Sequence, residues 1–304
     1  MVKRDDYEEL KTEGRNTRTM GLDRMSTLEM MRVMNDENKV VAAAVETQLP
    51  QIAQAVDRIA AALENGGHLI YVGAGTSGRL GVVDASECPP TFGVDERLVR
   101  GLMAGGRGAM FSAVEGAEDD PEAGAADLHA DGVCAGDVVV GLSASGGAPY
   151  VLRALREAKK IGAVPIGITC NPDSRMAPLC EIVIAPYVGP EVIQGSSRLK
   201  AGTAQKMVLN MLSTGAMVRT GRVYQNLMVD LCISNSKLSD RALRILRHAT
   251  GVGEEDASRL LKQAGGSVKT AIVMQLGGVD ADQARRALEE TGGWVGPAIQ
   301  KLKV

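Results

Sequence analysis

Two stretches of the chain combine glycine with hydroxyl side chains where a strand is expected to turn into a helix. They are "GAGTSG" at 73–78 and "GLSASGGAP" at 141–149. A glycine-rich turn lets the backbone approach a phosphate, and the free N–H groups and dipole of a helix N-terminus favour an anion. Two such turns in one sheet predict a site for a compact phosphorylated ligand, although a serine at such a position can also be a helix N-cap. The residues expected to bind the ligand here are Gly75, Thr76, Ser77, Ser143, Ser145 and Gly146.

The first turn formally fits the G-x-G-x-x-G pattern of dinucleotide-binding loops. Thr76 and Ser77 place hydroxyls where that loop usually has small neutral residues. The acids of "VDERLVRG" (94–101) precede the next expected strand, whereas a ribose-binding acid would end it. The pattern therefore predicts no nicotinamide cofactor.

Carboxyl groups lie between the two turns along the chain. Glu87 lies in "DASECPP", and the two prolines behind it restrict the backbone, although an isolated glutamate is most often a solvated charge. Two carboxyl groups in different protonation states can perform acid–base chemistry without a metal. The second run, "EGAEDDPE", offers four acids, and the residues alone do not choose among them: Glu115, Glu118, Asp119 and Asp120.

Short apolar runs alternate with helical patterns through the first two thirds of the chain. Helices of this length between strands imply right-handed crossovers, and so a parallel sheet covered on both faces. The predicted fold class is therefore α/β. The expected strands are 68–73, 98–105, 137–145, 163–170 and 180–186, with a helix over 148–162.

Helical periodicity predicts the remaining elements. The stretch 27–64 is helical, with a break expected at Asn35 and Asp36 and a further helix starting near Pro50. The segment 197–217 is apolar nearly all round and is expected to be buried, in the domain or against a second subunit. From about residue 240 short helices alternate with Gly-Gly and Gly-Val turns, which predicts domains at 1–240 and 241–304. The tail resembles a ubiquitin-associated (UBA) module, or is simply a helical packing appendage.

Composition excludes several classes of protein. The 304 residues carry a net charge of −3, so no basic excess is available for nucleic acid. Five scattered cysteines indicate reduced thiols in the cytoplasm, and three distant histidines predict no metal site. No stretch reaches the roughly 18 apolar residues of a membrane span, and the N-terminus has no signal-peptide core. We expect a cytoplasmic protein without metal or cofactor, with no nucleic-acid or membrane partner.

Four longer motifs are similar to the N-acetylmuramic acid 6-phosphate etherase family, a branch of the sugar isomerase (SIS) fold. They are "LIYVGAGTSGRLGVVDASECPPTFG", "AVEGAEDD", "GSSRLKAGTAQKMVLNMLSTGAM" and "NLMVD", and the resemblance covers nearly the whole chain. It implies a SIS-type parallel sheet flanked by helices, with a small C-terminal helical module. It also implies cleavage of the D-lactyl ether to give N-acetylglucosamine 6-phosphate and D-lactate, in the recycling of cell-wall sugars.

The resemblance assigns roles to individual residues. Glu87 matches the acid that assists lactate departure and later activates water, and Glu118 matches the base at carbon 2. Ser196, Ser197 and Lys200 of the third motif match the substrate-binding segment.

One departure from the family pattern concerns charge near the ligand. Gly147 and Ala148 stand where the family often has Arg-Thr, which removes a cation near the anionic ligand. Arg79, Arg198 and Lys200 remain as candidates to meet phosphate or the lactyl carboxylate.

Two other functions fit the same loops. An aldose–ketose isomerase would share the base but need no acid at carbon 3, and the family also resembles the glucokinase regulatory protein, a sugar-phosphate sensor without catalysis. A homodimer is expected from the apolar surface of 197–217 and of the N-terminal helices.

Overall fold

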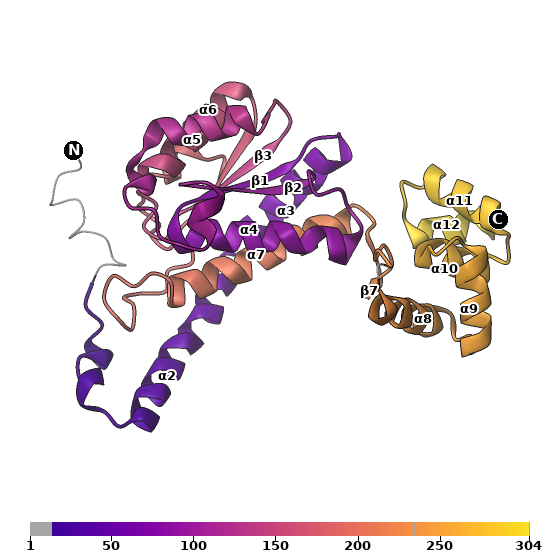
Figure 1. Cartoon of the computed structure of the whole chain (residues 1–304), viewed down its shortest axis with the longest axis horizontal. Coiled ribbons are helices and arrows are strands. Elements are labelled where there is room, and N and C mark those ends of the chain that lie inside the picture. Colours follow the sequence, from indigo (N-terminus) through magenta and orange to yellow (C-terminus); the bar gives the residue numbers. More distant parts are fainter. Residues whose placement is uncertain (1–13, 234, 304) are drawn as a thin grey trace. The chain divides into compact units, whose positions relative to one another are not determined.

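The computed structural model describes residues 14–233 and 235–303 (Figure 1). Their contacts form two compact units. The first unit runs to Ser86 and resumes over Arg97–Ser213, and the second comprises Glu87–Glu96 and the chain from Thr214 onward. A domain boundary at residue 240 stays a prediction.

The first unit is built on a five-stranded parallel sheet of order β2-β1-β3-β4-β5. All five strands lie within the ranges expected from the apolar runs, and the α/β class is confirmed. β1 and β3 are buried along their whole length, as strands covered on both faces should be. The strands are β1 Leu69–Gly73, β2 Val99–Met103, β3 Val138–Leu142, β4 Val164–Ile168 and β5 Ile182–Ile184.

Helices cover both faces of this sheet (Figure 1): α5 and α6 lie on one face, and α4 and α7 lie on the other. Tyr150, Val151 and Leu155 of α6 belong to the core cluster that also contains Ile70 and Val139 of the sheet. The helices of this layer are α4 Gly75–Phe92, α5 Pro121–Ala130, α6 Pro149–Ile161 and α7 Lys200–Arg219. The short helices are η2 Thr17–Thr19, η3 Leu22–Arg24, η4 Arg107–Met110, η5 Ala117–Asp119 and η6 Ala177–Leu179.

The N-terminal helices break later than expected. α2 spans Thr27–Glu46 without interruption and α3 spans Leu49–Glu64, so the break predicted at Asn35 and Asp36 is wrong. Asp36 is tolerated inside the helix because its carboxylate pairs with Lys39 one turn later, at 2.7 Å. Pro50, in the first turn of α3, sets the actual break, since it has no N–H to continue α2.

The second unit is helical apart from a two-stranded hairpin of β6 Val223–Tyr224 and β7 Leu227–Met228. α10 is the central helix, because its Ala271, Ile272 and Val273 are fully buried in the core of the unit. The tail is thus helical, as expected, while its kinship with ubiquitin-associated modules stays a prediction. The helices are α8 Ser236–Thr250, α9 Glu254–Gln263, α10 Val268–Gly277, α11 Ala281–Glu290 and α12 Val295–Leu302.

Candidate functional site

The two glycine- and serine-rich turns follow neighbouring strands of the sheet. β1 pairs with β3, and its last residue, Gly73, lies beside Leu142, the last residue of β3. The turns 73–78 and 143–147 therefore leave the same edge of the sheet side by side. This carboxyl edge is where open α/β sheets bind their ligands.

The three glycines of the first turn have two structural roles. A Cβ on Gly73 would lie 2.7 Å from the backbone of Gly78, and a Cβ on Gly78 would lie 2.6 Å from the Gly73 carbonyl oxygen, so β1 and α4 could not pack with larger residues there. Gly75 has a φ of 54°, a conformation that favours glycine. The turn thus brings α4 close to the end of β1.

α7 packs against this first turn. The buried Ser77 hydroxyl donates a hydrogen bond to the side-chain oxygen of Gln205 at 2.9 Å. A Cβ on Gly202 would stand 3.6 Å from the Thr76 methyl group, which is ordinary contact distance. Gln205 was not expected as a site residue, although it stands inside the conspicuous "AGTAQK" motif.

The serines of the second turn shape the turn itself. The Ser143 hydroxyl accepts a hydrogen bond from the N–H of Gly146 at 3.1 Å, and the Ser145 hydroxyl accepts one from Gly147 at 3.2 Å. Neither serine is the N-cap of α6, because that position is Ala148, whose side chain makes no capping bond. The N–H groups in the first turn of α6 therefore have no side-chain cap.

Gly146 could not be another residue in this backbone. Its φ is 70°, and a Cβ would lie 2.3 Å from Cβ of Ser174. Ser174 is buried, and its hydroxyl has no hydrogen-bond partner in the part of the chain that the structure describes. A buried unpaired hydroxyl beside the second turn is a polar group that a bound ligand or water could satisfy. Sequence analysis did not single out Ser174.

Ser196 and Ser197 lie in the turns that lead into α7. Both are half-buried, and the Ser197 carbonyl accepts the first hydrogen bond of the helix from Gly202 at 2.9 Å. The Glu191 carboxylate accepts hydrogen bonds from the N–H groups of Lys200 and Ala201, both at 2.9 Å. This buried acid occupies the helix N-terminus as an anion from the chain itself, and sequence analysis missed it.

The three basic candidates differ sharply in their surroundings. The Lys200 ammonium is buried and bonded to the Glu37 carboxylate at 2.6 Å, which differs from the expectation that it meets an anionic ligand. Arg79 donates to the carbonyl oxygens of Ala109 and Met110 at 2.7 and 3.1 Å. Arg198 is exposed, and no residue among 14–233 and 235–303 pairs with its guanidinium.

The acidic run forms η5 and the start of α5. Asp120 is the N-cap of α5, and its carboxylate accepts hydrogen bonds from Glu122 and Ala123 at 3.0 and 3.1 Å. This capping role separates Asp120 from the other acids of the run. η5 contacts α6, the helix that follows the second turn, and Glu118 stands exposed on it.

Glu87 lies on α4, in the part of that helix that begins the second unit. Its side chain is exposed, while the next residue, Cys88, is buried. Pro89 and Pro90 are inside the last helical turn, and α4 ends before Gly93, whose φ is 61°. Glu118, by contrast, belongs to the first unit.

Burial raises the pKa of the Cys170 thiol to about 12, and the charge of Glu191 adds to this effect, so the thiol stays protonated at neutral pH. Within residues 14–233 and 235–303, no three His, Cys, Asp or Glu side chains are grouped as metal ligands. In the same residues no helix combines the length and apolar character needed to cross a membrane.

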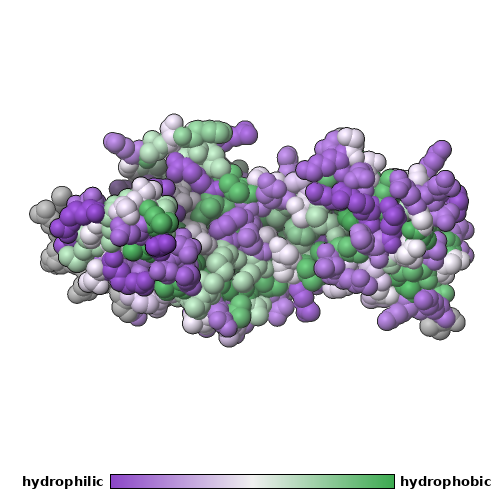
Figure 2. Space-filling view, turned by 90° about the horizontal axis from the view of Figure 1, so that it is seen from below, coloured by the Kyte–Doolittle hydropathy of each residue, from purple (hydrophilic) through white to green (hydrophobic). Residues whose placement is uncertain are grey.

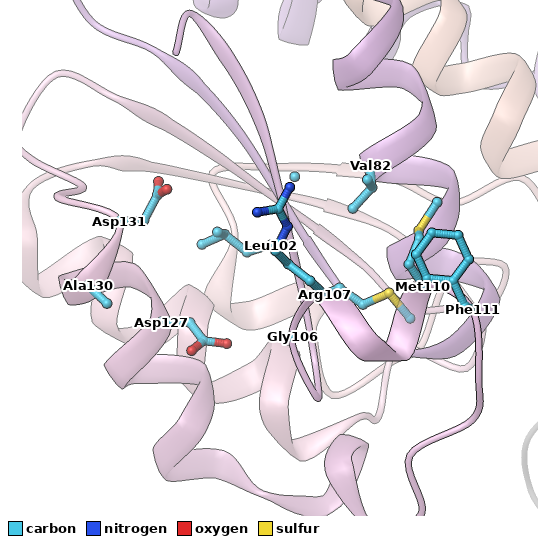
Figure 3. A pocket seen from close by; sticks show the side chains of 11 residues that line it. Val82, Leu102, Gly106, Arg107, Met110, Phe111, Asp127, Ala130 and Asp131 are labelled. Atoms are coloured by element: carbon cyan, nitrogen blue, oxygen red, sulfur yellow. The ribbon is translucent and has the colours of Figure 1, made fainter. Parts of the chain in front are cut away.

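A cavity of about 550 Å³ lies beside the edge strand β2, and Met103 in its lining pairs in register with Gly73 of the first turn. Figure 3 shows Arg107 extending into the space between Asp127 of α5, with Asp131 just after that helix, and Val82 of α4. Both acids are already engaged, Asp127 with the Tyr150 hydroxyl at 2.6 Å and Asp131 with Arg100 at 2.8 Å. None of the sequence-predicted site residues lines this cavity.

Three family models match the chain. The N-terminal SIS domain of glucokinase regulatory protein matches residues 51–159, and the SIS domain matches residues 119–215. The C-terminal lid domain of glucokinase regulatory protein matches residues 225–269.

Curated relatives match almost from end to end. The N-acetylmuramic acid 6-phosphate etherase of Serratia proteamaculans (strain 568) is 57% identical over 292 residues, 96% of this chain and 98% of the relative. The etherase of Clostridium beijerinckii is 52% identical, with 96% of each chain covered, and that of Salmonella typhi is 55% identical, with 96% and 98% covered. Among solved structures, a phosphoheptose isomerase from Francisella tularensis is similar at a TM-score of 0.48 and 18% identity, over 64% of this chain and 100% of the other.

Proposed function

Because the chain belongs to the N-acetylmuramic acid 6-phosphate etherase family, we propose that it cleaves the D-lactyl ether of that sugar phosphate. The observation that carries the proposal is the 52–57% identity to curated etherases over nearly the full length of both chains. The products are N-acetylglucosamine 6-phosphate and D-lactate, which places the reaction among the carbon–oxygen lyases and in the recycling of cell-wall sugars.

The chemistry needs one base and one acid. An ether resists direct hydrolysis because alkoxide is a poor leaving group, but the open-chain aldehyde makes the hydrogen on carbon 2 acidic. In the proposed reaction Glu118 takes this proton, the bond between carbon 3 and the ether oxygen breaks, and Glu87 protonates the departing oxygen. Water then adds at carbon 3, giving its proton back to Glu87, and carbon 2 is reprotonated. The atoms balance without a metal or a nicotinamide.

The phosphate is assigned to the carboxyl edge of the sheet. The turns at 73–78 and 143–147 leave adjacent strands there, and α7 packs against the first of them. The uncapped N–H groups of α6 and the hydroxyls of Ser143, Ser145 and Ser174 suit phosphate oxygens. Arg198, exposed beside Ser197 and unpaired among residues 14–233 and 235–303, is a cation that we assign to an anionic group of the substrate.

We also propose that the protein is a cytoplasmic homodimer. Leu28 and Met31, one helical turn apart on α2, are 60% and 46% exposed. Figure 2 shows apolar side chains gathered in patches between hydrophilic ones on one face of the molecule. By contrast, the apolar residues of α7, such as Val208 and Leu212, are already buried within the chain. The proposed dimer contact is therefore assigned to α2.

The decisive experiment is incubation of the purified protein with N-acetylmuramic acid 6-phosphate, followed by an enzymatic assay for free D-lactate. Wild type should release lactate, and Glu87→Gln and Glu118→Gln should each lose at least about a hundredfold of the rate. Asp119→Asn, a neighbouring acid without an assigned role, serves as the matched control and should stay close to wild type. Tight binding of the substrate without any lactate would point to a sugar-phosphate sensor instead. Conversion of an aldose phosphate to its ketose would favour an isomerase.

A further inference from the structure

A buried polar network joins the N-terminal segment to the chain that leads into α7. Asn16 donates to the Glu37 carboxylate at 2.8 Å and to the Pro190 carbonyl at 3.3 Å. The Thr19 hydroxyl donates to the Val192 carbonyl at 2.9 Å. The Glu37 carboxylate also pairs with the Lys200 ammonium at 2.6 Å and with Arg18 at 3.1 Å.

This network holds an irregular segment at three points. Residues 185–199 contain no helix or strand, so regular backbone pairing does not fix their position. Pro190 and Val192 are held through their carbonyls, and Lys200 is held through its side chain. Ser196 and Ser197, the predicted ligand serines, lie between the second and third of these points.

The charges in the network are costly unless they stay paired. Glu37 is 4% exposed and Lys200 is 2% exposed. Burial alone would raise the pKa of Glu37, but hydrogen bonds from Lys200 and Asn16, together with the charges of Lys200 and Arg18, hold it below 4.5. Removing the charge of one partner would leave the other buried and uncompensated. The pair therefore fixes the start of α7 against α2.

We infer that Glu37, with Asn16 and Thr19, is a positioning residue for the reaction, because it holds the Ser196–Ser197 segment in its ligand-binding place. The inference rests on the proposed function and adds a residue that touches no substrate. The N-terminal segment thereby supports the active site through two long-range contacts. Glu37 and Lys200 are 163 residues apart in sequence, and Thr19 and Val192 are 173 residues apart.

The test compares Glu37→Gln with Asp36→Asn, its neighbour on α2, which makes the same change of charge at an exposed carboxylate that pairs with the surface residue Lys39. Serine bonds to the substrate act in the ground state and in the transition state alike, so a displaced segment weakens binding rather than turnover. We expect the KM of Glu37→Gln, and its dissociation constant for N-acetylglucosamine 6-phosphate, to rise about tenfold. Its kcat should change less than about threefold, and both constants of Asp36→Asn should match wild type.

Hydrogen exchange measured by mass spectrometry gives a local readout. In Glu37→Gln, peptides covering 190–200 should exchange faster, while those of β3 keep their protection. If Glu37→Gln fails to fold, Thr19→Val tests the same clamp without a buried charge, and should raise KM about fivefold. If Glu37→Gln, or Thr19→Val in its place, folds and shows the same KM and the same exchange at 190–200 as Asp36→Asn, the inference is overturned. A wild type that releases no lactate would refute the proposed function alone, since the exchange measurement needs no turnover.

Discussion

Glu87 and Glu118 are assigned to different steps, and isotope exchange can separate them. If Glu118 removes the hydrogen on carbon 2, Glu118→Gln should stop both lactate release and exchange of that hydrogen with solvent deuterium. If Glu87 protonates the departing oxygen, Glu87→Gln should stop lactate release while exchange persists. Proton NMR of the substrate in deuterium oxide measures both processes. Exchange retained in Glu118→Gln and lost in Glu87→Gln would reverse the two roles.

Ser143 and Ser145 should contribute to binding more than to turnover. Each hydroxyl accepts a hydrogen bond from a glycine N–H of the turn, which leaves its own proton free to donate to a phosphate oxygen. Replacing both by alanine should raise KM about tenfold or more, with kcat changed less than about threefold. Ser258→Ala, at an exposed position on α9, is the control. A large fall in kcat with KM intact would contradict the assignment.

At the scale of elements, the strands were predictable and the partners of side chains were not. The strand expected over 137–145 contains β3, Val138–Leu142, because an uninterrupted apolar run suits a strand buried on both faces, but the strand ends three residues earlier than expected, where the serine turn begins. The break in α2 was expected because Asn35 and Asp36 have poor helix propensity. The prediction was wrong because tertiary structure and the Asp36–Lys39 pair override that propensity.

What sequence analysis could and could not find around the candidate site has a similar cause. The serine turns could be found because glycine and serine mark them locally. The burial of Lys200 could not, because its partner Glu37 lies 163 residues away in a helix without any motif. Gln205 stands in the "AGTAQK" motif, but the motif alone does not indicate its partner. The packing of α7 on the first turn shows that its side-chain oxygen accepts a hydrogen bond from Ser77.

Asp137 joins two strands and should make stability depend on pH. It is fully buried, and its carboxylate accepts hydrogen bonds from the N–H groups of His68, before β1, and Cys134, before β3, at 2.8 and 2.9 Å. Burial would raise its pKa, but the bonds from Cys134 and His68 hold it below 3.8. The stabilisation is therefore present above pH 3.8 and is lost as the pH falls through the lower pKa of the folded state.

Asp137→Asn should lower the free energy of unfolding at neutral pH by about 2 kcal/mol, since an amide N–H₂ replaces one acceptor. Urea unfolding at a series of pH values measures this, and the difference from wild type should shrink below pH 3.8. Asp240→Asn, whose carboxylate pairs with Arg244 on the surface, should show no comparable effect. A difference that stays constant with pH would mean that the charge of Asp137 is irrelevant.

Lys269 of α10 binds the chain around the β6–β7 hairpin, at Gly221 and Asp230. Its buried ammonium donates to the Gly221 carbonyl at 3.1 Å and to the Asp230 carboxylate at 2.5 Å. Lys269→Met should lower the free energy of unfolding by about 2 kcal/mol, because the half-buried Asp230 carboxylate loses its nearer cation and hydrogen-bond donor, while Arg222 stays at 3.7 Å. Lys301→Met breaks the exposed pair with Glu290 in the same unit and should change stability little. Equal effects of the two variants would show that burial does not strengthen the Lys269 bond.

At the scale of the whole molecule, the proposed homodimer depends on the exposed apolar face of α2. The double variant Leu28→Glu/Met31→Glu adds two negative charges to this face and should give a folded monomer in sedimentation velocity, while wild type sediments as a dimer. Lys39→Glu changes the net charge by the same amount on the same helix without removing apolar surface, and should stay dimeric. If the double variant remains a dimer, the contact lies elsewhere. If wild type is already a monomer with full activity, the assembly proposal is wrong, and a site completed by one chain alone explains the chemistry.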